Sequence, residues 1–196
     1  MPQYLKYRRE LPCFKIVDNY FSNEEIDKIL DLEDLQTFAK GTFGQPQRQQ
    51  SDKGARDSEV SWLYPDSQSQ WVFDKFGALL GYVNHDVFMY DIDGFDNFQY
   101  TRYKKNHHYD WHFDTILEYS EWDRKISAVI MLSDPDEYKS GELEIAVSGH
   151  PEKCISVKPK KGSVVFFASW MSHRVKPVTS GVRKSLVTWV MGKRTC

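Results

Sequence analysis

Residues 162–190 have the sequence GSVVFFASWMSHRVKPVTSGVRKSLVTWV, in which short runs of β-branched and aromatic residues alternate with glycine, proline and serine. Such runs are typical of β-strands, and the residues between them are typical of turns. Four similar runs precede this stretch: NFQYTRY (97–103), KISAVIML (125–132), GELEIAV (141–147) and CISVK (154–158). Many short strands joined by turns predict an antiparallel sandwich or barrel. We therefore expect this half of the chain to form a jelly roll, that is, a double-stranded β-helix.

The first half of the chain carries two helical signals. Ser22 starts the segment SNEEIDKILDL, and Glu25 three residues later completes a capping box, which marks a helix N-terminus. Apolar residues also recur at helical spacing between residues 70 and 88. We expect a single domain over residues 1–196, of the α+β class but mainly β. Residues up to about 90 would form helical support, and residues 91–196 would form the jelly-roll core.

The composition excludes a wholly disordered chain, because 40% of the 196 residues are hydrophobic and 15% are aromatic. A formal net charge of -2 gives no overall attraction to nucleic acid or to a membrane surface. Cys13, Cys154 and Cys196 form no CxxC motif, so neither a disulfide framework nor a zinc knuckle is expected. We expect no signal peptide, because residues 1–14 lack its apolar run, and no apolar run approaches membrane-spanning length. We expect a cytoplasmic protein without a nucleic-acid or membrane partner, and the oligomeric state stays open.

The segment WHFDT, residues 111–115, offers a first pair of metal ligands. Alternate residues of a strand share a face, so His112 and Asp114 can converge on one ion. Such a pair is weak evidence alone, because it occurs by chance in many proteins. His173 follows 59 residues after Asp114, between two expected strands, where a core or turn histidine would be the simpler explanation. Two histidines and one carboxylate nevertheless form the facial triad of non-haem iron oxygenases, which leaves positions open for a cosubstrate and O2.

Arg183 and Ser185 give a fourth feature, ten residues beyond His173. On a strand their side chains share a face, where the guanidinium offers a bidentate fork to a carboxylate and the serine adds a hydroxyl. A surface strand would be the ordinary place for an arginine. The order of the motifs favours the functional interpretation, because HxD is followed by a distant histidine and then by Arg-x-Ser.

With these motifs the chain resembles the 2-oxoglutarate- and Fe(II)-dependent dioxygenases of the prolyl 4-hydroxylase type, over about residues 95–192. The block at residues 162–190 is very similar to the C-terminal block of that family, and Trp189 fits it. Tyr109 matches a recurring aromatic residue three positions before the first histidine. Residues 140–143, SGEL, resemble the Gly-Gly-Glu-Leu turn of the family, with serine in place of the first glycine.

The resemblance implies a double-stranded β-helix and a specific set of cofactors. Fe(II) would be held by His112, Asp114 and His173, and 2-oxoglutarate would chelate it through its 1-carboxylate and keto oxygen. The 5-carboxylate of 2-oxoglutarate would pair with Arg183, and Tyr103 occupies the position of a tyrosine that touches this cosubstrate. O2 would be the second cosubstrate, succinate and CO2 would be released, and ascorbate is a candidate reductant.

The resemblance also suggests a substrate, since prolyl residues in proteins or peptides are the commonest targets of this family. Residues expected to line or flank the mouth of the site are Trp62, Arg102 and Trp189, together with Arg56, Trp111 and Arg174. Each is more commonly structural or solvated in proteins of known structure. His107 and His108 lie in the polar run KKNHHYD and are expected to be loop residues. The polar stretch at about 40–61 would be either a flap over a peptide or a surface loop.

Three alternatives remain open from the sequence. The same chemistry could act on a free amino acid, a small metabolite or a nucleobase. A jelly-roll binding module could keep the fold without turnover, although the complete set of His112, Asp114, His173 and Arg183 argues against it. A zinc or manganese cupin is the third alternative, but its ligands are usually richer in histidine.

Overall fold

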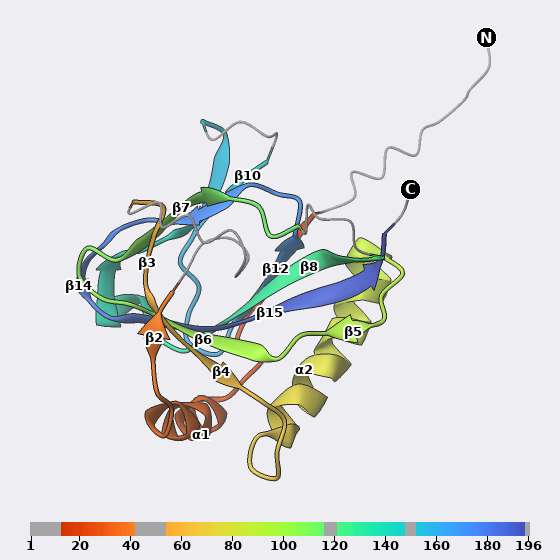
Figure 1. Ribbon diagram of the computed structural model, residues 1–196, viewed down its shortest axis with the longest axis horizontal. Helices are drawn as coiled ribbons and strands as arrows, with labels where there is room; N and C mark the ends of the chain where they lie inside the picture. The colour runs from red at the N-terminus through yellow and green to blue at the C-terminus, as the bar shows by residue number, and fades with distance from the viewer. Residues whose placement is uncertain (1–12, 42–53, 116–120, 148–151, 195–196) are drawn as a thin grey trace.

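The computed structural model describes residues 13–41, 54–115, 121–147 and 152–194. Two β-sheets face each other, and two main helices lie on the side of the larger sheet that faces away from the smaller one (Figure 1). Most of the polar stretch for which a flap was predicted, residues 42–53, lies outside the described residues.

The larger sheet has eight strands, and each pairing within it is antiparallel. Its order is β1-β12-β8-β15-β6-β4-β2, with β5 added to β15. The strands are β1 (Phe14–Val17), β2 (Ala39–Lys40), β4 (Glu59–Leu63), β5 (Gly94–Phe95), β6 (Phe98–Tyr103), β8 (Trp122–Met131), β12 (Val164–Ala168) and β15 (Arg183–Lys193).

The smaller sheet has the order β11-β10-β13-β7-β3 and is also antiparallel. Its strands are β3 (Arg56–Asp57), β7 (His108–His112), β10 (Leu143–Ala146), β11 (Cys154–Val157) and β13 (His173–Val175). A separate ribbon pairs β9 (Tyr138–Ser140), which follows a short 3₁₀ turn at Pro135–Glu137, with β14 (Val178–Gly181). From β6 onward the chain passes repeatedly between the two sheets, which is the jelly-roll arrangement, so the predicted mainly-β double-stranded β-helix is confirmed.

One part of the predicted division of the chain needs correction. Residues before 90 supply more than helical support, because β1, β2 and β4 join the larger sheet and β3 joins the smaller one. The short runs FKIV and RD carry too few residues to give a periodic signal of their own. The extent of the domain over residues 1–196 stays a prediction.

Helix α1 (Asn23–Asp34) begins with the predicted capping box, in which the Ser22 hydroxyl accepts from the Glu25 N–H and Glu25 accepts from the Ser22 N–H. Helix α2 (Gln70–Val83) continues as a π-helical turn at Asn84–Phe88 and ends at Met89, whose φ is 53°. Both helices bury their apolar faces against the outer face of the larger sheet. No helix among the described residues has the length and apolar character to cross a lipid bilayer.

Aromatic packing and one buried ion cluster attach the helices to this outer face. Phe76 of α2 contacts Phe98 and Phe166 of the sheet, and the Tyr100 hydroxyl donates to the Ile29 carbonyl of α1 at 3.0 Å. Glu33 of α1 is fully buried and accepts from Arg102 and Lys184, each at 2.8 Å.

Arg102 and Lys184 are direct cross-strand partners on β6 and β15. Glu33 therefore links α1 to both strands through one carboxylate, whose burial is compensated by two cations. Arg102 also stacks on Phe38 at 3.7 Å from the ring centroid. This places the Arg102 side chain on the outer face of the sheet, beside the helix.

We predict that Glu33→Ala lowers the free energy of unfolding by about 3–5 kcal/mol, because it leaves two cations without their buried counter-charge. Urea unfolding followed by circular dichroism measures this change. The matched control is Asp27→Ala on the same helix, which removes an exposed ion pair with Lys161 and should cost no more than about 1 kcal/mol. Equal effects of the two substitutions would show that Glu33 is no structural link.

Candidate metal centre

The three predicted ligands come together where the smaller sheet meets the loop after β7. His112 ends β7, His173 begins β13, and the two residues are direct cross-strand partners. Asp114 lies two residues beyond the end of β7, so the prediction that it shares a strand with His112 needs correction. Its backbone N–H donates to the Ser169 carbonyl at 3.0 Å, and this bond to the neighbouring loop turns the chain at that point.

A β-bulge in β7 sets the direction of the His112 ring. His112 pairs with His173 but Tyr109 pairs with Val175, so β7 has one more residue than β13 over this interval. Tyr109 and His112 consequently lie on the same face, and their rings stack at 3.5 Å with an interplanar angle of 14°. The Arg56 guanidinium lies 4.6 Å from the Tyr109 ring centroid. The stack restricts rotation of the His112 ring.

Backbone carbonyls fix both imidazoles in the same way. His112 Nδ1 lies 2.7 Å from the Asp110 carbonyl oxygen, and His173 Nδ1 lies 3.0 Å from the Met171 carbonyl oxygen. Carbonyls only accept hydrogen bonds, so each Nδ1 carries the proton and each Nε2 keeps a free lone pair. The two Nε2 atoms lie 3.7 and 3.4 Å from the carboxylate oxygens of Asp114. Both histidines thus present a ligand atom to the same point.

The Asp114 carboxylate is itself held by Ser127 of β8. The Ser127 hydroxyl donates to Asp114 Oδ2 at 2.7 Å and lies 2.9 Å from the Ser169 hydroxyl. A hydrogen bond of this kind orients a carboxylate ligand. Ser127 belongs to the larger sheet, so the site joins both sheets.

The protonation states at neutral pH are those that a metal requires. Burial, with a smaller effect of His173, lowers the pKa of His112 to about 3. Burial alone would raise the pKa of Asp114, but the adjacent His173, together with His112 and Ser127, lowers it below its usual value. A neutral imidazole and an ionised carboxylate can both donate electron pairs to a cation.

The donor set fits a divalent transition metal. One ligand atom from each of His112, Asp114 and His173 lies within 4.8 Å of the other two. Ligand atoms at roughly 2.0–2.2 Å from a common ion would be at most about 4.4 Å apart, which is compatible with this spacing. Two imidazoles and one carboxylate on one side of the ion leave its other positions open, as non-haem Fe(II) requires.

The predicted anchor, Arg183, is buried on the inner face of the larger sheet with 2% of its surface exposed. Its Nη1 donates to the Ser185 hydroxyl at 3.1 Å, and its Nη2 lies 3.7 Å from the sulfur of Met131. Nε has no hydrogen-bond partner among the described residues. Tyr103 is the cross-strand partner of Arg183, and the guanidinium carbon lies 5.5 Å from its ring centroid. A buried guanidinium with a free donor fits the distal carboxylate of 2-oxoglutarate.

The predicted substrate residues divide between the two faces of the larger sheet. Trp62 and Trp189 lie near each other, with ring centroids 6.3 Å apart. Arg102 points to Glu33 on the opposite face, so the structure does not bring it to the metal ligands. Arg174 pairs with Glu144 at 2.7 Å and stacks on Trp111. These pairings account for Arg102, Arg174 and Trp111 as structural residues.

Of the two loop histidines, His107 precedes β7 as predicted, but His108 is its first residue. The Nε2 atom of His108 lies 2.7 Å from the Gly54 carbonyl, a contact that fixes the approach of β3. Neither histidine joins the triad. The polar run gave no sign of a strand there because β-branched residues are absent from it.

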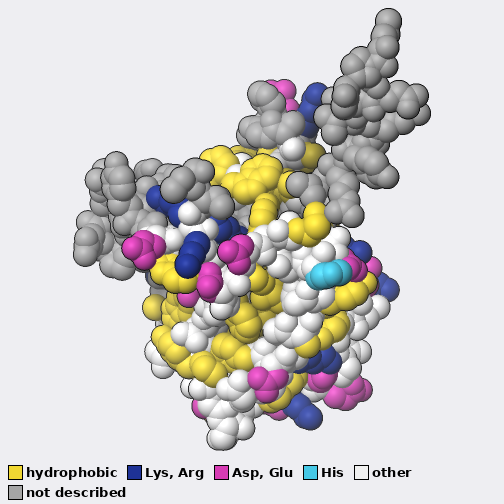
Figure 2. All heavy atoms as spheres, turned by 90° about the vertical axis from the view of Figure 1, so that its right-hand side faces the viewer, with side chains coloured by type: hydrophobic (Ala, Val, Ile, Leu, Met, Phe, Trp, Pro, Cys, Tyr) yellow, Lys and Arg dark blue, Asp and Glu magenta, His cyan; other side chains and the backbone are white. Residues whose placement is uncertain are grey.

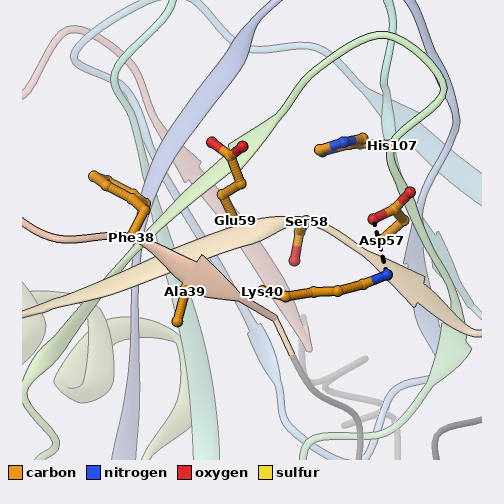
Figure 3. Close-up of a pocket in the computed structure, with 7 residues that line it drawn as sticks. All are labelled: Phe38, Ala39, Lys40, Asp57, Ser58, Glu59 and His107. Atoms are coloured by element: carbon orange, nitrogen blue, oxygen red, sulfur yellow. Dashed lines mark ion pairs between the residues drawn. The ribbon is translucent and has the colours of Figure 1, made fainter.

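A separate hollow of about 330 Å³ lies at the other end of β7, beside β2 and β4 (Figure 3). Its lining residues are Phe38, Ala39, Lys40, Asp57, Ser58, Glu59 and His107. Its two carboxylates are already paired with lysines, Asp57 with Lys40 at 3.7 Å and Glu59 with Lys104 at 2.6 Å. None of the candidate metal or anchor residues lines it.

Sequence reasoning missed the groups that orient the ligands. Ser127 could have been recognised from the sequence, because it is a serine within the apolar strand run KISAVIML. The hydroxyl of a buried serine needs a hydrogen-bond partner. No feature of the sequence indicates the role of the Asp110 and Met171 carbonyls, because every residue carries a carbonyl and its direction depends on the fold.

The chain is similar to known proteins over part of its length. Residues 98–191 match the 2OG-Fe(II) oxygenase superfamily. A PKHD-type hydroxylase from Xylella fastidiosa (strain M23) is 35% identical over 102 residues, which are 47% of this chain and 43% of the relative. A second PKHD-type hydroxylase, from Crocosphaera subtropica, is 35% identical over 94 residues, 47% of this chain and 41% of that relative. The matched region is thus less than half the length of these curated relatives.

Among solved structures, the viral collagen prolyl hydroxylase of Paramecium bursaria Chlorella virus-1, in complex with 2-oxoglutarate, has a TM-score of 0.66. It is 21% identical, and the alignment covers 91% of this chain and 96% of that one. A prolyl hydroxylase from Trichoplax adhaerens, bound to a hypoxia inducible factor peptide fragment, has a TM-score of 0.72 at 19% identity, over 90% and 82% of the two chains. At these identities the likeness shows the fold.

These findings confirm the resemblance to 2-oxoglutarate- and Fe(II)-dependent dioxygenases of the prolyl 4-hydroxylase type. Together with the His112, Asp114 and His173 cluster they support Fe(II), 2-oxoglutarate and O2 as cofactor and cosubstrates. The roles of individual residues stay predictions.

We predict that His112→Ala, Asp114→Ala and His173→Ala each abolish stoichiometric Mn(II) binding in isothermal titration calorimetry, because each removes one of three ligands. Ser127→Ala removes a hydrogen bond to Asp114 and no ligand, so it should weaken binding by roughly 10- to 100-fold. Thermal unfolding controls for loss of fold. Wild-type affinity in any two of the alanine variants would contradict the triad.

We also predict that acid destabilises the metal-free protein through His112. Its folded pKa, about 3, lies below the ordinary value of roughly 6.5, so between these values the unfolded chain binds the proton and the folded chain does not. The free energy of unfolding should therefore fall as pH falls from 7 to 5, with a contribution approaching about 1.4 kcal/mol per pH unit. His112→Asn should remove this contribution in urea unfolding, and identical pH slopes would contradict it.

Proposed function

We propose that this protein is an Fe(II)- and 2-oxoglutarate-dependent dioxygenase that hydroxylates a prolyl residue in a protein or peptide. The observation that carries the proposal is that the two sheets together hold two Nε2 atoms, a carboxylate and a buried guanidinium with a free donor. A metal and a dicarboxylate would both be satisfied there. We include an intracellular location in the proposal, as expected from the small number and wide spacing of the cysteines.

Each residue has a defined task in this proposal. His112, Asp114 and His173 hold the metal, while the stack of Tyr109 and the carbonyls of Asp110 and Met171 keep the rings oriented. When bound, Fe(II) with 2-oxoglutarate and O2 supplies the oxidising chemistry, in which decarboxylation to succinate and CO2 is coupled to hydroxylation of a C–H bond. The chain contributes positions, charge and exclusion of water.

Arg183 and its neighbours bind the far end of the cosubstrate. The guanidinium is always charged, and burial strengthens its attraction for a carboxylate. Ser185 holds one side of the guanidinium, and Tyr103 covers its face. With the distal carboxylate held there, the keto acid end of the molecule would be left to bind the metal held by His112, Asp114 and His173.

Aromatic side chains beside the site support a prolyl substrate. Trp189 is a cross-strand neighbour of Ser127, the residue that holds Asp114, and Trp62 lies next to it on the side open to solvent. The partly exposed indole of Trp62 offers a flat apolar face, which suits the apolar ring of proline. Arg124 stacks on Trp189 at 3.9 Å, and neither Arg124 Nε nor Trp189 Nε1 has a hydrogen-bond partner among the described residues. These two donors could be satisfied by peptide carbonyls.

Exposed aromatics next to the ligands extend the apolar surface. Phe113 lies between His112 and Asp114 with 58% of its surface exposed, and Trp170 lies three residues before His173 with 52% exposed. Figure 2 shows hydrophobic side chains over much of the face that includes α2, the start of β8 and the end of β15, its upper part included. A protein segment could cover such a surface, whereas a free amino acid would leave most of it exposed. The Trichoplax neighbour, which holds a peptide fragment, supports a peptide substrate.

The test is to incubate the Fe(II)-loaded protein with 2-oxoglutarate, O2 and a library of peptides that contain proline, and to measure peptide mass and succinate together. We predict products heavier by 16 Da, formed in equal amount to coupled succinate. Trp189→Ala should reduce the hydroxylated product much more than it reduces Mn(II) binding. The matched library with alanine in place of proline is the control.

Two outcomes would contradict parts of the proposal separately. Products found only with free amino acids or metabolites would reject the prolyl substrate and keep the dioxygenase chemistry. Absence of succinate with every substrate, in protein that binds the metal stoichiometrically, would reject the dioxygenase function.

A further inference from the structure

Two buried polar groups near one another lack partners in the part of the chain that the structure describes. They are the hydroxyl of Tyr138 and Nε of Arg183, and each of these residues has only 2% of its surface exposed. Burial raises the pKa of Tyr138, and the nearby Arg183 is the largest influence that opposes this rise. Arg183 also acts on the Tyr138 hydroxyl through a side-chain contact, which shows that the two groups are close. Because neither group has an acceptor of good geometry among the described residues, a carboxylate from a ligand would satisfy both.

The fold holds the Tyr138 ring firmly in this position. Tyr138 begins β9 and pairs with Gly181, which lies two residues before Arg183. A Cβ at Gly181 would lie 2.0 Å from the Glu137 carbonyl oxygen and 2.8 Å from Tyr138 Cα, so only glycine allows β9 and β14 to approach this closely. Gly141, at φ 70°, likewise leaves room for the ring, because a Cβ there would lie 3.3 Å from it.

Lys158, the residue that follows β11, also contacts Tyr138. The Lys158 ammonium donates to the Tyr138 carbonyl at 2.8 Å and lies 4.3 Å from the ring centroid. The ring is therefore fixed by its own strand partner and by a cation on its face. If this residue served only for packing, phenylalanine would avoid the free-energy cost of burying an unpaired hydroxyl.

The partners of Arg183 show which of its edges is free. Among the described residues, Nη1 donates to Ser185, Nη2 faces the sulfur of Met131, which is a weak acceptor, and Nε faces no acceptor. The Nε–Nη2 edge can therefore take one carboxylate in a bidentate manner. A carboxylate bound along this edge has further lone pairs, and a hydroxyl donor beside the edge would satisfy one of them.

We propose that the Tyr138 hydroxyl is a second donor to the distal carboxylate of 2-oxoglutarate and that, with Arg183, it makes the site selective for a dicarboxylic keto acid. This inference rests on the proposed function. Tyr138 arrives from the β9–β14 ribbon, whereas Arg183, Ser185 and Tyr103 belong to the larger sheet. The anchor is thus built from two separate parts of the fold.

The test measures binding, without turnover, by isothermal titration calorimetry on the Mn(II)-loaded protein under anaerobic conditions. Two probes are compared, 2-oxoglutarate and 2-oxopentanoate, which has the same keto acid end and chain length but no distal carboxylate. We expect Tyr138→Phe to weaken 2-oxoglutarate binding by about 10- to 100-fold and to leave 2-oxopentanoate binding unchanged. Without ligands, Tyr138→Phe should unfold at the same or a higher temperature, because it removes an unpaired buried hydroxyl.

Tyr100→Phe is the matched control, since the Tyr100 hydroxyl is also buried but donates to the Ile29 carbonyl on the outer face of the larger sheet. It should lower the unfolding temperature and leave both binding constants unchanged. Equal affinity of wild type and Tyr138→Phe for 2-oxoglutarate would overturn the inference, and so would an equal loss for both probes. If the wild type itself binds no 2-oxoglutarate, the proposed function fails and the inference fails with it.

Discussion

His112 and His173 are 61 positions apart in the sequence, yet they lie directly opposite each other on antiparallel strands β7 and β13. This pairing is the contact on which the candidate site depends, because it brings two imidazoles to a ring separation of 4.1 Å. The bulge in β7 turns His112 toward Asp114, and the two carbonyl contacts leave both Nε2 atoms free. A shift of one residue in this register would direct one histidine to the opposite face and leave the carboxylate with one partner.

The larger sheet supplies the groups of the candidate site that the smaller sheet lacks. Its inner face supplies Ser127 to the carboxylate and Arg183 to the proposed cosubstrate, and its outer face carries both helices. Glu33 ties α1 to β6 and β15 immediately next to the cross-strand pair of Tyr103 and Arg183. The helices therefore act as a rigid backing for the strands that hold the anchor, while the two sheets enclose the candidate site.

Residue type and spacing were sufficient to predict the strands of the second half, both helices, the metal-ligand candidates and Arg183. Runs of β-branched and aromatic side chains indicate strands. Metal ligands can be predicted because few residue types have side chains that bind a metal. The position of Asp114 beyond the strand and the bulge at Asp110 and Trp111 were not predictable, because both depend on hydrogen bonds to segments far away in the sequence. Arg102 shows the same limit, since its partner Glu33 is 69 residues away and only the fold decides on which face they meet.

The central claim is that His112, Asp114, His173 and Arg183 form one site for a metal and a dicarboxylic keto acid. The most direct measurement is a crystal structure of the protein with Mn(II) and 2-oxoglutarate, grown without O2. The account predicts Mn(II) on both Nε2 atoms and the Asp114 carboxylate, with 2-oxoglutarate between the metal and Arg183. Mn(II) bound elsewhere, or 2-oxoglutarate bound with its distal carboxylate away from Arg183, would contradict it.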